Sequence, residues 1–109
     1  MPPLSWNEIK DRALHFSKKW EGETRERAES QTFWNDFFEI FGIDRRRVAS
    51  FEEPVKNLDN NYSFIDLFWK GNLLIEHKSR GESLDKAYTQ ALDYFNGLKE
   101  NELPRYVLV

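Results

Sequence analysis

The chain of 109 residues, with a mass of 13.1 kDa, has the size of about one domain. Nine Phe, four Trp and four Tyr supply enough large side chains for one hydrophobic core, which argues against extensive disorder. The net charge of −3 argues against a module that holds nucleic acid by bulk positive charge alone. The absence of Cys excludes disulfide scaffolds, Cys-ligated zinc and thiol catalysis.

The sequence carries no targeting or membrane signal. No apolar run approaches the roughly 18 residues that span a membrane. The segment Met1–Trp6 also lacks the basic and apolar regions of a signal peptide. We therefore expect a cytoplasmic protein with no membrane partner.

The first half of the chain predicts two helices followed by a charged connection. Ser5 and Glu8 have the spacing of a helix N-cap and its capping box. Apolar residues then recur at intervals of three and four up to Trp20, as on one face of a helix. A second, aromatic-rich helix is expected over Arg25–Phe41, and Asp44–Arg47 is expected to be a connection.

The second half of the chain predicts strands and one further helix. Alternating and β-branched segments, turn residues and helical spacing place these elements as follows: a strand over Val48–Glu52 stopped by Pro54, strands over Tyr62–Trp69 and Leu73–Lys78, a helix from the N-cap Ser83 to Leu98, and a strand over Arg105–Val109.

The resulting order, α-α-β-β-β-α-β, predicts an α/β protein of the α+β type, with a mixed sheet flanked by helices. Residues 1–109 are expected to form a single domain. Because the chain stops inside its last expected strand, we expect a fragment of a longer multidomain protein rather than a complete protein with a short final strand.

Charged residues inside apolar strands are the informative ones, because a buried charge is costly unless something compensates it. Asp66, Glu76 and Lys78 are such residues. If the turn is centred on Gly71, Asp66 lies opposite Glu76, and all three side chains share one face of the sheet. A two-residue turn would instead pair Asp66 with Ile75 and separate them.

Two carboxylates this close repel each other unless a cation lies between them. Oxygen ligands suit Mg²⁺ or Mn²⁺ rather than Zn²⁺. A bound Mg²⁺ can polarise a phosphodiester, and Lys78 beside the carboxylates could orient or deprotonate a water or neutralise charge in the transition state. The residue types and spacing therefore indicate metal-assisted phosphodiester hydrolysis.

The pattern Asp66, nine residues, Glu76-His77-Lys78 resembles the PD-(D/E)XK nuclease motif on its hairpin, although Ile65 stands where that motif has Pro. More closely, the chain resembles the N-terminal endonuclease domain of MmeI-like (type IIG/IIL) restriction–modification enzymes. The helix around Gln31–Phe38 and the helix around Tyr88–Tyr94 carry that likeness together with the motif.

The resemblance implies a cytoplasmic protein of the prokaryotic type, with a restriction-endonuclease-like core and a role for each motif residue. Asp66 and Glu76 would hold Mg²⁺, with Mn²⁺ as a possible substitute. The backbone carbonyl of His77 would be a third ligand, and Lys78 would be catalytic. Double-stranded DNA would be bound through attached recognition and methyltransferase domains, and S-adenosylmethionine would be used only in the full-length protein. The isolated fragment is expected to cleave weakly or not at all.

Three further residues are candidates for supporting roles. Gln90 and Tyr94 have the Gln-x3-Tyr spacing of RecB-like nucleases, although a helix-flank residue and a core Tyr would look the same. Glu29, near the start of the aromatic helix, resembles an acid that adds a metal ligand in this superfamily. A favourable charge in a first helical turn is its ordinary explanation.

For the other features we favour structural explanations over functional ones. The arginines of Arg45–Arg47 could contact phosphates, but a solvated run at a helix end is more common, and Lys18-Lys19 is interpreted in the same way. The aromatic residues of the second helix have core spacing, and the His77 side chain is expected to pack or to be a surface polar group rather than a catalyst. A second Glu-x-Lys, Glu8-Ile9-Lys10, lies on a helix without an upstream strand Asp.

Three functions remain open at this point. The favoured one is a Mg²⁺-dependent DNA endonuclease domain of a restriction–modification enzyme. The alternative is a catalytically silent module that serves as an interaction or structural part of a DNA methyltransferase or phage-defence protein. A free-standing junction-resolving nuclease is a third and weaker hypothesis, since the chain lacks a basic surface.

Overall fold

The computed structural model describes residues 3–22, 26–78 and 81–109, with the side chains of residues 26–28 left undescribed. It contains two compact units, residues 1–47 and 48–109, each of which is described by itself. The expected helix start at Arg25 lies outside the described residues. Among the described helices, none has the length and apolar character needed to cross a membrane.

The first unit is built from two helices that pack through aromatic side chains. Helix α1 spans Trp6–Lys19 and helix α2 spans Glu26–Ile40. The hydroxyl of Ser5 accepts a 3.2 Å hydrogen bond from the backbone N–H of Glu8, which confirms the predicted N-cap. The ring of Phe16 on α1 lies 5.0 Å from that of Phe33 and 6.0 Å from that of Phe37 on α2. These aromatic residues therefore hold the helices together, as their spacing predicts.

The predicted connection before the first strand is in part a helix. Residues Arg45–Val48 form the single turn α3, so the prediction of a connection over Asp44–Arg47 is wrong for its last three residues. The carboxylate of Asp44 accepts a 3.1 Å hydrogen bond from the backbone N–H of Arg46. An acid in this position satisfies an N–H that a helix start leaves unpaired, which explains the turn.

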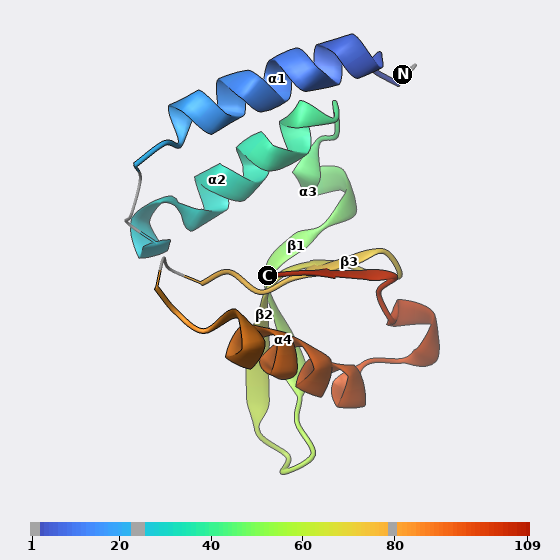
Figure 1. Ribbon diagram of the computed structural model, residues 1–109. Helices are drawn as coiled ribbons and strands as arrows, with labels where there is room; N and C mark the ends of the chain where they lie inside the picture. The colour runs from blue at the N-terminus through green and yellow to red at the C-terminus, as the bar shows by residue number, and fades with distance from the viewer. Residues whose placement is uncertain (1–2, 23–25, 79–80) are drawn as a thin grey trace. The chain divides into compact units, whose positions relative to one another are not determined.

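The second unit is a four-stranded mixed sheet with the order β1-β2-β3-β4 (Figure 1). The strands are β1 (Ser50–Lys56), β2 (Tyr62–Trp69), β3 (Leu73–Ile75) and β4 (Tyr106–Leu108). Strands β1, β2 and β3 are antiparallel neighbours, and β4 runs parallel to β3. Helix α4 (Leu84–Asp93) and two 3₁₀ turns, η1 (Tyr94–Gly97) and η2 (Glu100–Glu102), connect β3 to β4. The expected element order is confirmed, with α3 and the 3₁₀ turns added to it.

Strand β1 is longer than predicted and contains a proline. It runs to Lys56, whereas Pro54 was expected to stop it, and Pro54 pairs with Phe64 of β2. Because β1 is an edge strand with β2 as its partner, a residue without an N–H can be accommodated if that position faces away from the partner. The physical reason for the error is that edge position, which is not visible in the local sequence.

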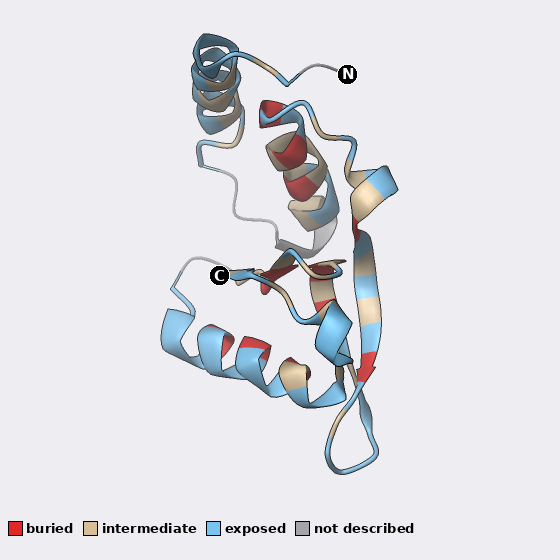
Figure 2. Cartoon of the chain, turned by 90° about the vertical axis from the view of Figure 1, so that its right-hand side faces the viewer, coloured by how far each residue is buried: buried red, intermediate tan, exposed pale blue. Residues whose placement is uncertain are grey.

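Helix α4 packs on the sheet through small residues and one tyrosine. Ala87 and Ala91 are fully buried, and Tyr94, at the start of η1, is 3% exposed. They belong to or lie beside a core that also contains Val55, Ile65, Phe68 and Leu74. Figure 2 shows the buried positions of α4 on one side of the helix and exposed positions on the other. The helix was expected to reach Leu98, but its α-helical part ends at Asp93.

Candidate active site

The hairpin of β2 and β3 sets the relation between the two candidate metal ligands. Trp69 pairs with Leu73 and Leu67 pairs with Ile75. Continued by one position, this register places Asp66 opposite Glu76. The predicted register is confirmed, and the alternative pairing of Asp66 with Ile75 is excluded.

Asp66 is tied to the chain beyond β3 by its own side chain. Its carboxylate accepts a 2.7 Å hydrogen bond from the backbone N–H of His77. Strand β3 was expected to reach Lys78 but ends at Ile75. The reason is this bond, because the amide of His77 is satisfied by a side chain rather than by a backbone carbonyl of β2. On the other side, the N–H of Glu76 still donates to the carbonyl of Leu108, at 3.0 Å.

Glu76 is the buried charged side chain among the described residues, with 3% of its surface exposed. Burial raises the pKa of its carboxyl from the ordinary 4.5 to about 7, and the nearby charge of Asp66 acts in the same direction. Lys78 and the hydroxyl of Tyr94 oppose that rise. The site therefore favours either a proton or an added cation on Glu76.

Lys78 is held against the buried carboxylate. Its ammonium nitrogen lies 3.5 Å from Oε1 of Glu76, and 29% of the Lys78 side chain is exposed. The three residues singled out in the sequence, Asp66, Glu76 and Lys78, thus lie together at the end of the hairpin.

Tyr94 and Gln90 extend the cluster from α4 and η1. The hydroxyl of Tyr94 lies 3.2 Å from Oε2 of Glu76 and 3.2 Å from the carbonyl oxygen of Phe64. It accepts a 3.0 Å hydrogen bond from the side-chain amide of Gln90. Since one hydroxyl proton serves two acceptors, Tyr94 bridges β2 and Glu76. Burial raises the pKa of the Tyr94 hydroxyl, so it stays protonated.

The remaining candidate residue belongs to the other unit. Glu29 lies near the start of α2 and is half-buried. Its expected contribution to a metal site stays a prediction. Within the described ranges, no group of three or more His, Asp or Glu side chains lies close enough to hold a metal ion. A metal at the hairpin would therefore take two carboxylates, with other oxygen atoms completing its shell.

Comparison with known protein families gives a match that covers this cluster. A family model described as "MmeI, N-terminal domain" matches residues 11–109, which include every residue of the cluster at the end of the hairpin. The chain belongs to the MmeI N-terminal domain family. Searches of curated protein sequences and of solved structures gave no match.

Membership in the MmeI N-terminal domain family relates the chain to restriction–modification enzymes that act on DNA. Within the described residues, the fold is a mixed α+β sheet flanked by helices, as expected. Its relation to the PD-(D/E)XK core stays a prediction. The Asp66–His77 bond was not anticipated, because a side chain that replaces a ladder partner leaves no periodic signal in the sequence.

Proposed function

We propose that this chain is a metal-dependent DNA endonuclease domain of a restriction–modification enzyme. The single observation that supports it most is the buried Glu76 carboxylate opposite Asp66, with Lys78 at 3.5 Å. A buried carboxylate beside a second carboxylate is expensive in an ordinary fold, and a divalent cation is the simplest compensation. The family relation supports DNA as the substrate.

The donor set fits magnesium. The carboxylates of Asp66 and Glu76 are hard oxygen ligands, and the carbonyl of His77 is proposed as a third. Mg²⁺ is commonly held by one or two carboxylates with water in the remaining positions, so the lack of a third acid within the described ranges is compatible with it. When bound, Mg²⁺ or Mn²⁺ supplies polarisation of the scissile phosphodiester and neutralises part of its charge.

The residues of the chain itself have distinct roles in this proposal. Lys78 orients the attacking water and offsets the negative charge that develops on the phosphate. Tyr94 holds one oxygen of Glu76, and Gln90 holds the Tyr94 hydroxyl. The backbone N–H of His77 fixes the carboxylate of Asp66. Tyr94 and Gln90 are therefore positioning residues, whereas Asp66, Glu76 and Lys78 act on the substrate or its metal.

The deciding experiment uses the full-length protein that carries this chain. Lys78→Ala is expected to abolish DNA cleavage while methylation by the same polypeptide continues. Lys86→Ala, which removes an exposed lysine of α4, is the matched control and should cleave normally. If Lys78→Ala cuts at the normal rate, the assignment of this site is wrong.

One observation favours a second candidate, a catalytically silent interaction module. Both oxygens of Glu76 already have partners within the chain, namely Lys78 and Tyr94, so the cluster is partly compensated without a metal. If the domain is such a module, neither Mg²⁺ nor Mn²⁺ would stabilise its fold at millimolar concentration. Asp66→Asn would then change neither the DNA cleavage of the full-length protein nor the effect of metal on the stability of the domain.

A further inference from the structure

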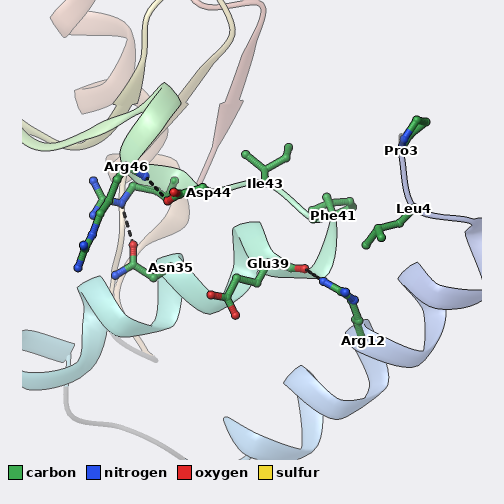
Figure 3. A pocket seen from close by; sticks show the side chains of 11 residues that line it. Pro3, Leu4, Arg12, Asn35, Glu39, Phe41, Ile43, Asp44 and Arg46 are labelled. Carbon is green, nitrogen blue, oxygen red and sulfur yellow. Dashed lines mark hydrogen bonds between the residues drawn. The ribbon is translucent and has the colours of Figure 1, made fainter. Parts of the chain in front are cut away.

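The first unit contains an open pocket of about 960 Å³ that is lined by arginines from two helices (Figure 3). Arg12 comes from α1, and Arg45 and Arg46 come from α3. We refer to these three arginines and the space between them as the arginine pocket. A chain with a net charge of −3 has three positive side chains around one hollow, and Arg12 is more than 30 residues from Arg45 and Arg46 in sequence.

Two of the arginines are oriented by neutral oxygen atoms. Arg12 donates a 2.8 Å hydrogen bond to the backbone carbonyl of Glu39. Arg45 donates a 2.7 Å hydrogen bond to the side-chain oxygen of Asn35. Such bonds fix the direction of a guanidinium group without cancelling its charge, and planar guanidinium groups match phosphate oxygens well.

Arg45 is partly buried and lies beside a second positive charge. Burial lowers the pKa of Arg45 and the charge of Arg46 lowers it further, while the attraction of Asp44 is the smallest of the three effects. A phosphate bound here would offset the repulsion between Arg45 and Arg46.

We propose that the arginine pocket is a second contact with DNA, which binds backbone phosphates and lies outside the catalytic cluster. This inference rests on the proposed function, because it takes DNA as the substrate. Contacts to phosphates position a duplex without reading its sequence, which suits a domain whose overall charge is negative. The lining also includes the apolar residues Leu4, Phe41 and Ile43.

Two acidic residues, Glu39 and Asp44, line the pocket together with the arginines, and Glu39 gives the proposal a test of opposite sign. The Glu39 carboxylate also lines the pocket, and Figure 3 shows it between Arg12 and Arg46. It would repel a phosphate. Since Arg12 bonds to the backbone of Glu39 and not to its side chain, Glu39→Gln removes the repulsion while keeping the arginine in place.

The experiment measures binding of a short duplex to the 109-residue chain by fluorescence anisotropy, with a chelator present so that no cleavage occurs. Arg45→Gln/Arg46→Gln is expected to weaken binding roughly ten-fold and to flatten the dependence of log K on log salt by about two. Glu39→Gln is expected to tighten binding. Lys10→Gln/Lys18→Gln, which removes the same charge from exposed positions of α1, is the matched control and should have less than half the effect on log K.

Equal weakening by the lysine control, or no binding by the unaltered chain at low salt, would overturn the proposal. If the double arginine variant fails to fold, as judged by circular dichroism, Glu39→Gln decides, and unchanged or weaker binding counts against the pocket. The two proposals fail separately. Normal duplex binding with no cleavage by the full-length protein refutes the nuclease, whereas cleavage with arginine-independent binding refutes the pocket.

Discussion

The backbone N–H of His77 donates a 2.7 Å hydrogen bond to the carboxylate of Asp66, across the open end of the β2–β3 hairpin. This bond ends the backbone ladder and at the same time fixes the carboxylate beside the His77 peptide. A residue that we propose as a metal ligand thus also makes a structural hydrogen bond. Changes at Asp66 can therefore separate the charge of the site from its structural role.

Asp66→Asn should keep the fold and lose the chemistry. The amide oxygen of Asn can still accept from the N–H of His77, but the negative charge is gone. We expect the free energy of unfolding to change by less than about 1 kcal/mol, with DNA cleavage by the full-length protein reduced at least about 100-fold. Asp85→Asn on the exposed start of α4 is the control. Cleavage at the normal rate by Asp66→Asn would remove Asp66 from the site.

Stability without metal should depend on pH through Glu76. Its pKa is about 7 in the fold and 4.5 ordinarily, so the folded state holds the proton more tightly between these values. Stability from this group is therefore greatest at low pH and falls as pH rises through about 7, by at most about 3 kcal/mol. Thermal melts of the chain with a chelator, from about pH 5 to about pH 8, measure this. Glu76→Gln should remove that part of the slope, and an identical slope in both proteins would contradict it.

Divalent metal should stabilise the chain most where Glu76 is ionised. A cation competes with the proton on that carboxylate, so the gain from Mg²⁺ or Mn²⁺ is expected to be larger at about pH 8 than at about pH 5. At ten times the dissociation constant it amounts to about 1.4 kcal/mol. Melting temperatures with and without metal test this, with Ca²⁺-free buffer throughout. A gain that persists unchanged in Asp66→Asn would place the metal elsewhere.

Tyr94→Phe isolates the hydroxyl that bridges β2 and Glu76. The ring keeps its packing, while the Glu76 carboxylate and the Phe64 carbonyl lose a donor. We expect a destabilisation of about 1–3 kcal/mol and a fall in kcat larger than any rise in KM, because Glu76 is less well positioned. Tyr88→Phe, on the exposed side of α4, is the matched control. Equal small losses in both variants would mean that the Tyr94 hydroxyl has no special role.

Gly97→Ala tests the close approach of η1 to β1. A Cβ at this position would clash with the carbonyl oxygen of Lys56 and lie 2.5 Å from Cγ2 of Val55. The edge strand would have to shift, at a cost of about 1–3 kcal/mol. Denaturant unfolding measures this, and Asn101→Ala in η2 serves as an exposed control. If the free energy of unfolding equals that of the unaltered chain, β1 can shift to accept the added methyl group without loss of stability.

Much of the fold could be read from local patterns. The Ser5 cap, the helical spacing of Phe16 and Phe33, and the β-forming run from Tyr62 to Trp69 each depend on neighbours in sequence, and the structure agrees with them. The turn around Gly71 predicted a hairpin but left two registers open, and the pairing of Trp69 with Leu73 in the structure decides between them. Local patterns failed at Pro54 and at the end of β3, where edge position and a side-chain bond decide the outcome.

By itself, the sequence determined the element order and the three chemical candidates Asp66, Glu76 and Lys78, because charges inside apolar strands stand out without a structure. Tertiary structure alone decided how deeply Glu76 is buried and which of its carboxylate oxygens Tyr94 contacts. It also decided that Arg12 and Arg45 line the same pocket. These properties depend on segments that are distant in sequence, and desolvation and hydrogen-bond geometry are set only when those segments pack together.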